Sequence, residues 1–296
     1  LLRLHVSRLT FLHTKEIVQA GFVNWVPTAI ATIGTHLSVI AVYGFHGPLE
    51  AGLYYISFAM ASVISAISAS VMGLAFPILS GMTDGRKRAC WRAIKLALVF
   101  TVPLTASLAA YPQVTLGFFS PEYAVASKML LVLLFATVPQ GLIDGVNSLA
   151  YAYGKYRLVL VMGLAISVPR TVMYMILTPS MGGLGAALAL LSGTAIGLVA
   201  AFGVTKGIGL KFQWRDLIVT FVPLLMVTVC KIPIPWFLGV TIVLVGSALT
   251  YTRLGLVTRR DLKESAEAFL PQNILSIGLR RFGWILRMLF GKQRFS

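Results

Sequence analysis

Arg170 is the residue best placed to bind an anionic substrate, because it lies deep inside an apolar stretch. It follows Pro169, about 8 residues from the outer end of an expected membrane-spanning helix, which is about 12 Å of helical rise. A guanidinium held at that depth could bind a phosphate group through two hydrogen bonds. It could equally bond to the carbonyl that Pro169 frees or to another helix, and residue type alone leaves both open.

A polar stripe lies one expected span before Arg170. Gln140, Asp144, Asn147 and Tyr151 are spaced by four, three and four residues, which places them on one face of a helix. This face is expected to border a polar cavity, where Asp144 could bind a cation or a proton, or complete a polar network. Helical rise separates Asp144 from Arg170 by about 9 Å along the bundle, so a direct ion pair is not expected.

Asn24 and His36 are polar residues within the first expected span. Polar groups at membrane depth usually face the interior of a bundle or a water-filled cavity. Each of the two could therefore line the cavity or be a hydrogen-bonded structural residue. The candidate substrate-binding residues are Arg170, Asp144, Asn147, Gln140, His36 and Asn24.

Motifs for catalysis and cofactor binding are missing from the sequence. It contains no Gly-x-x-x-x-Gly-Lys-Ser/Thr run, no Cys-x-x-Cys pair and no His-Glu-x-x-His helix, so we expect no nucleotide, metal or other cofactor. The nine acidic residues are scattered, and no loop outside the tail is long enough for a soluble catalytic domain. We therefore expect no enzyme and assign no catalytic residue.

The composition defines the class of fold that must position these residues. Of the 296 residues 57% are hydrophobic and 11% charged, whereas soluble domains carry about 25% charged residues. A helix needs about 20 apolar residues to cross a bilayer. We therefore expect an all-α integral membrane protein with about eight spans, at 18–43, 51–79, 94–117, 126–150, 157–178, 184–204, 212–231 and 234–252.

The basic residues predict how these spans are oriented. With the N-terminus inside, all but three of the 25 Lys and Arg fall in inner segments, and the outer loops 44–50, 120–123 and 178–183 contain none. Arg86, Lys87, Arg88 and Arg92 form one strong orientation signal. The net charge of +16 is thus explained by orientation and by attraction to anionic headgroups, and we expect no nucleic-acid partner.

Two ridges of small residues predict close helix packing. Such ridges let helix backbones approach each other in lipid. One consists of Gly185, Ala189, Gly193, Gly197 and Ala201, and the other of Ala61, Ser65 and Ala69 with Ser62, Ala66 and Ser70 beside it. Both are interpreted as packing surfaces.

The ends of the sequence differ from the spans. Residues 1–15 alternate between apolar and basic, as an interfacial connector would, and the sequence does not begin with Met, so we expect it to be the C-terminal part of a longer protein. Between Leu275 and Leu289, apolar residues recur at helical spacing beside basic ones. This predicts an amphipathic helix in the inner headgroup layer, or alternatively a helix that binds a partner.

Several runs of the sequence resemble a known family. They are Gly44–Tyr54, a small-residue helix ending in Ala75–Ser80, the polar helix end and basic turn Asn147–Arg157, and Gly182–Ala187. In their order and spacing over residues 1–211 they resemble the polysaccharide and lipid-linked oligosaccharide flippases of the multidrug/oligosaccharidyl-lipid/polysaccharide exporter superfamily. One departure is that the family commonly has an acidic residue late in the first span of a lobe, where this sequence has His36 and Ser38.

The resemblance implies two six-helix lobes around a substrate cavity, often followed by two extra helices. Residues 1–15 would be the connector, 16–211 the second lobe, 212–252 the two additional spans and 253–296 a cytoplasmic basic tail with the amphipathic helix. The first lobe is not in this chain and is the expected partner. The implied function is flipping of a polyprenyl- or dolichyl-phosphate-linked glycan by alternating access at the cytoplasmic membrane. The alternatives are a drug or cation exporter of the same superfamily, a membrane-embedded glycosyl or phosphoglycosyl transferase, and a structural partner in glycan assembly.

Overall fold

The computed structural model describes residues 11–229 and 235–256, and within them every regular element is a helix. Some side chains near the start of the first helix, that of Asn24 among them, lie outside this description. The elements are α1 (Phe11–Gly81), α2 (Arg86–Ala110), α3 (Pro112–Gly117), the 3₁₀ helix η1 (Pro121–Ala126), α4 (Ser127–Ala152), α5 (Tyr156–Ile208), α6 (Trp214–Val229) and α7 (Trp236–Arg253).

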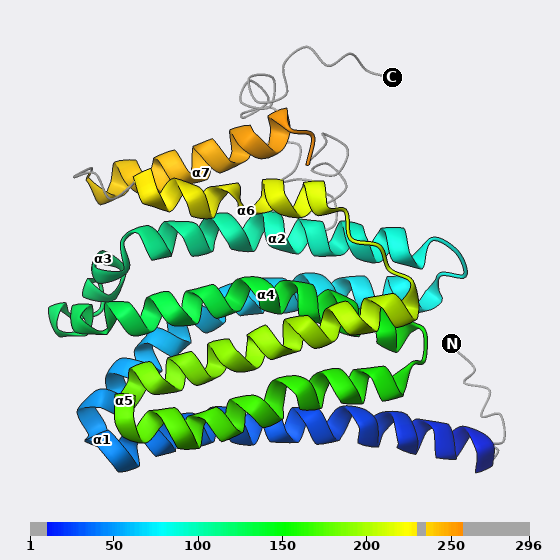
Figure 1. The fold of residues 1–296 in the computed structure, drawn as a ribbon. Helices are drawn as coiled ribbons and strands as arrows, with labels where there is room; N and C mark the ends of the chain where they lie inside the picture. Colours follow the sequence, from blue (N-terminus) through cyan, green and yellow to red (C-terminus); the bar gives the residue numbers. More distant parts are fainter. Residues whose placement is uncertain (1–10, 230–234, 257–296) are drawn as a thin grey trace, which may run out of the picture.

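Two of the helices reverse direction at a glycine. Gly47 in α1 has φ 83° and ψ −178°, and Gly182 in α5 has φ 58° and ψ −137°. A side chain is strained at such angles, so the reversal requires glycine at both positions. Each helix therefore forms two antiparallel arms, 11–46 and 48–81 in α1 and 156–181 and 183–208 in α5 (Figure 1). These arms confirm four of the eight predicted spans.

The remaining four spans correspond to α2, α4, α6 and α7. Segments of α1, α2, α4, α5 and α7 are long and apolar enough to cross a membrane, while the 16 described residues of α6 are fewer than a full span needs. The two C-terminal helices pack against α2 and against each other, outside the bundle made by α1, α2, α4 and α5 (Figure 1). The predicted six-helix lobe with two added helices is thus confirmed.

Some helix boundaries differ from the prediction. The first difference is in α5, where Pro179 does not end the first arm. This arm continues to the reversal at Gly182. The second difference is in α2, which begins at Arg86, so its basic residues form two helical turns instead of a loop. A third is α1, which begins at Phe11 within the predicted connector. Residues 1–10, most of the predicted turn at 231–235, and the predicted amphipathic helix at 275–289 lie outside the described residues.

The basic turns meet at one end of the bundle. Arg86 donates from Nη1 to the carbonyl of Ala152 at the end of α4, at 2.7 Å, and from Nε to the carbonyl of Met82. Lys155 donates from Nζ to the carbonyl of Gly207 near the end of α5, at 2.8 Å. Cations stabilise the exposed carbonyls at helix C-termini. The prediction that these turns share one end is confirmed, and the side of the membrane they face stays a prediction.

At the opposite end the two reversals contact each other. The carboxylate of Glu50 accepts a hydrogen bond at Oε1 from the N–H of Gly183, at 3.1 Å. It thereby satisfies a free donor at the start of the second arm of α5, where a helix N-terminus favours negative charge. His46 Nε2 lies 3.0 Å from the carbonyl oxygen of Thr178. This end of the lobe is therefore closed by polar contacts between α1 and α5.

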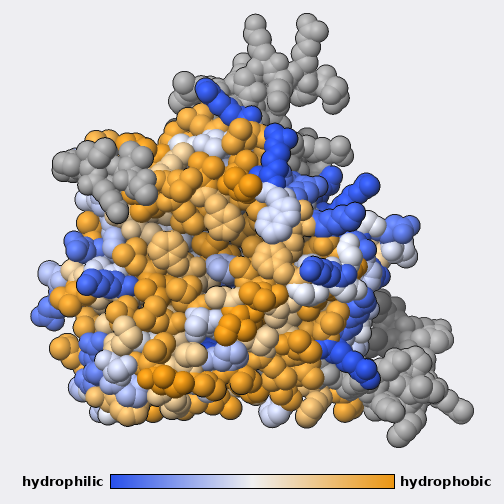
Figure 2. Space-filling view, viewed as in Figure 1, coloured by the Kyte–Doolittle hydropathy of each residue, from blue (hydrophilic) through white to orange (hydrophobic). Residues whose placement is uncertain are grey.

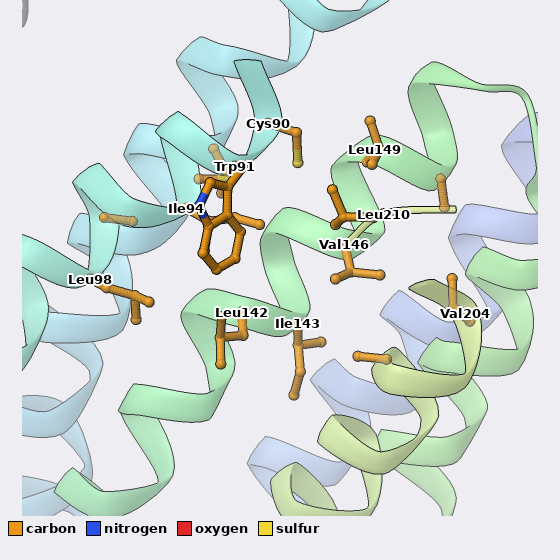
Figure 3. Close-up of a cluster of buried hydrophobic side chains, with 14 of the residues drawn as sticks. Cys90, Trp91, Ile94, Leu98, Leu142, Ile143, Val146, Leu149, Val204 and Leu210 are labelled. Carbon is orange, nitrogen blue, oxygen red and sulfur yellow. The ribbon is translucent and has the colours of Figure 1, made fainter. Parts of the chain in front are cut away.

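The interior is divided into two apolar cores along the bundle. Figure 3 shows the core near the basic end, where Trp91, Ile94 and Leu98 of α2 face Leu142, Ile143, Val146 and Leu149 of α4. The other core lies near the reversals and includes Tyr54, Leu130, Leu134, Tyr174 and Ala186.

On the outer surface, apolar side chains cover most of the middle of the face in Figure 2, and hydrophilic ones gather toward its edges. Such a surface suits contact with lipid and not with water.

Candidate functional site

A cavity of about 570 Å³ lies between α1, α4 and α5. On α4 its lining extends from Leu133, six residues after the start of the helix, to Tyr151 near the end of the helix. It therefore follows most of α4, about 27 Å of helical rise, to the basic end. Toward the reversals, the buried side chains of Tyr54 and Tyr174 pack in the apolar core there. A volume of this size is typical of small-ligand sites, which span about 300–1,000 Å³.

Arg170 lies on the wall of this cavity, deeper than the sequence predicted. Because the first arm of α5 continues to residue 181, Arg170 is about 17 Å from its outer end and about 21 Å from its start at Tyr156. Its Nε is buried and has no hydrogen-bond partner among the described residues. The sequence left open whether Arg170 binds a ligand or forms a structural hydrogen bond. Among the described residues, no structural hydrogen bond is formed through its Nε.

Close helix packing positions the base of the Arg170 side chain. The second arm of α5 packs closely on it, because a Cβ added at Gly193 would lie 2.6 Å from the Cβ of Arg170. One helical turn away is Tyr174, which is buried together with Tyr54 in the apolar core near the reversals. Tyr54 in turn donates a hydrogen bond to Ser38 Oγ at 3.1 Å. The base of the Arg170 side chain is thus tightly packed, and among the described residues its guanidinium forms no salt bridge.

The polar stripe of α4 forms another wall of the cavity. Gln140, Asp144, Asn147 and Tyr151 all line it, so the predicted common face exists. Gln140 donates from Nε2 to Asp144 Oδ1 at 2.8 Å, and the buried Oδ1 of Asn147 has no partner among the described residues. This wall therefore presents one free acceptor, Asn147 Oδ1, beside the carboxylate of Asp144.

Arg170 and Asp144 share the cavity without pairing. In the described part of the chain the one salt bridge joins Lys95 and Asp216, with 3.1 Å between nitrogen and oxygen. The expected offset between the two cavity charges thus agrees with the structure. Neither charge has a counter-charge among the described residues, so each of the two is available to a ligand that supplies one.

The two candidates in the first arm of α1 have different outcomes. His36 is exposed and is not among the residues that line the cavity, whereas Thr28 and Thr32 line it. A four-residue step turns a helix by about 40° beyond a full turn, which rotates His36 away from the face that begins at Thr28. The side chain of Asn24 lies outside the described residues.

The sequence also misjudged one ridge of small residues. Gly185, Ala189, Gly193, Gly197 and Ala201 are buried between helices, as predicted. In contrast, Ala61, Ser65 and Ala69 line the cavity together with their neighbours Ser62 and Ala66. Small side chains can bring helices together or leave space between them, and spacing alone does not distinguish the two.

The chemically active wall groups remain Arg170, Asp144 and Asn147, because hydroxyls such as those of Ser62 and Thr194 bond to their own helices.

The orientation residues lie outside the cavity. Arg86 is engaged with the ends of α1 and α4, while Lys87, Arg88 and Arg92 are exposed on the first turns of α2. Among the residues that the structure describes, no three His, Cys, Asp or Glu side chains come together to hold a metal ion.

The fold and the cavity define a class: an all-helical membrane protein whose lobe surrounds a charged cavity at membrane depth. Among solved structures, the fold is similar to "Lipid II flippase MurJ, inward closed conformation", with a TM-score of 0.68 and 18% sequence identity over 86% of this chain. The chain spans 56% of the length of that flippase. Neither family models nor curated protein sequences match the chain. The fold of this chain is thus similar to that of part of this helical flippase.

Proposed function

We propose that this chain is one lobe of a flippase that moves a polyprenyl- or dolichyl-phosphate-linked glycan precursor across the cytoplasmic membrane. The observation that carries the proposal is Arg170 on the wall of a cavity at membrane depth, with a buried Nε that has no partner among the described residues. A guanidinium in that setting matches the geometry and the charge of a phosphate linkage. The similarity of the fold to MurJ supports a lipid-linked substrate over the other classes of ligand.

The shape of the lobe suggests how a headgroup would enter. The cavity reaches the basic end, which the positive-inside rule assigns to the cytoplasm together with both termini. Toward the opposite end the two tyrosines are buried in the apolar core, and Glu50 joins the two reversals. A phosphate would enter from the cytoplasm, pair with Arg170, and leave when this lobe rocks against a second lobe. An ion gradient or the consumption of the product would supply direction.

Replacing Arg170 with alanine should lower translocation of the lipid-linked glycan by about tenfold or more. A hydrogen-bonded charge pair contributes about 1.5–3 kcal/mol, which corresponds to at least that factor. The assay is the fraction of glycan displayed outside cells that carry the variant protein, with the amount of inserted protein measured in parallel. Arg157→Ala is the matched control, because it removes an exposed arginine from the basic end. Normal display by Arg170→Ala at equal protein level would remove Arg170 from the mechanism.

A further inference from the structure

The cavity has two chemically different poles. At one, the Nε of Arg170 is a buried donor with no partner among the described residues. At the other, Asn147 Oδ1 is a buried acceptor without a partner, and Asp144 has Gln140 as its donor at Oδ1. An apolar ligand would satisfy neither pole, and a purely anionic ligand would satisfy only the first. A ligand that fills the cavity must therefore carry an anionic group and hydrogen-bond donors.

The distance between the poles limits how these groups are arranged. Asp144 lies eight residues before the end of α4, about 12 Å along the helix, while Arg170 lies about 21 Å from the start of the next helix. The poles are thus offset by about 9 Å along the bundle. This offset is comparable to the length of a phosphate group with one sugar residue attached.

Asp144 and Asn147 are suited to binding sugar hydroxyls. They lie three residues apart on one helix face, where side chains are neighbours. A carboxylate and an amide oxygen can accept hydrogen bonds from two adjacent hydroxyl groups, and Gln140 holds the carboxylate in position. Hydroxyl donors satisfy the orphaned acceptor of Asn147 without bringing a second charge into the membrane interior.

We propose that Asp144 and Asn147 form a subsite for the sugar that is joined directly to the phosphate. This inference rests on the proposed function, because it places the phosphate at Arg170. The lobe then recognises the first sugar of the precursor and not the distal part of the glycan. Specificity follows, because a lipid that lacks this sugar leaves the acceptors of α4 unpaired.

The test compares two lipids that differ by one sugar. The full chain is placed in nanodiscs, and binding is measured for a polyprenyl diphosphate with and without a single hexosamine. Asp144→Asn should weaken binding of the sugar-bearing lipid by about tenfold and leave the sugar-free lipid unchanged, since one charged hydrogen bond is lost. Asn147→Ala, as a second variant, should act in the same direction. Asp84→Asn, which neutralises an exposed carboxylate between α1 and α2, is the matched control.

The outcomes separate this inference from the proposed function. Unchanged binding of the sugar-free lipid also demonstrates that a variant is folded. Equal weakening of both lipids, or of neither, by both Asp144→Asn and Asn147→Ala would overturn the sugar subsite. Arg170→Ala in the same assay should weaken both lipids, and if it weakens neither, the phosphate role fails while the sugar subsite is still judged by the α4 variants.

Discussion

Replacing Gly185 with alanine should prevent the two arms of α5 from packing and should leave little folded protein. The added Cβ would lie 2.2 Å from the carbonyl oxygen of Leu177 and 2.6 Å from its carbonyl carbon. Both atoms belong to the backbone just before the reversal at Gly182, so no side-chain rotation relieves the clash. Overpacking costs about 1–3 kcal/mol, and a backbone clash lies at or above the upper end of that range. Thermal unfolding of the purified chain measures the effect.

Gly203→Ala is the control for this prediction. Gly203 lies in the same arm of α5, but a Cβ there meets no atom within 4 Å. Alanine favours the helix over glycine by about 1 kcal/mol, so this variant should be as stable as the natural protein or slightly more stable. An equal melting temperature for Gly185→Ala and Gly203→Ala would show that the small-residue ridge is not required for packing.

Gly193→Ala should damage both stability and transport. Its Cβ would lie 2.6 Å from the Cβ of Arg170 and 2.8 Å from the carbonyl oxygen of Ile166, so the first arm of α5 must shift. We expect a loss of about 1–3 kcal/mol in the free energy of unfolding. Because the guanidinium moves with the arm, translocation per folded molecule should also fall by about tenfold, since small displacements at a positioned group are costly.

The comparison with Gly197→Ala isolates the effect on Arg170. A Cβ at Gly197 would lie 2.3 Å from Cγ1 of Ile166, and the three atoms nearest to it belong to Ile166 and Ile143, not to Arg170. Both variants should lower the melting temperature, but Gly197→Ala should keep normal translocation per folded molecule. If the two variants reduce translocation equally, close packing of the arms, and not the position of Arg170, limits transport.

The sequence was most informative where the bilayer imposes a simple rule. Apolar length gave the eight helical segments, and basic residues gave the turns that meet at one end, because both follow from the cost of placing charge in lipid. The stripe from Gln140 to Tyr151 was likewise predictable, since four residues at helical spacing share a face whatever the fold. Arg170 was identified as a candidate because a cation is costly at membrane depth and is therefore usually functional there.

Other parts of the site depend on how helices are placed against each other. Ala61 and Ser65 form a ridge like that of Gly193 and Gly197, yet one ridge lines a cavity and the other is packed. The two ridges differ in the helix that faces each of them, and residue spacing does not predict which helix that is. His36 was expected in the cavity for its polarity, but helix rotation places it outside the lining.

A structure of the full chain in a lipid nanodisc, with a polyprenyl-diphosphate-linked hexosamine bound, tests the central claim most directly. We predict a phosphate oxygen about 2.7–2.9 Å from a guanidinium nitrogen of Arg170, with the sugar alongside α4. A headgroup bound instead at the basic turns, or against α6 and α7, would contradict the assignment of the cavity as the substrate site.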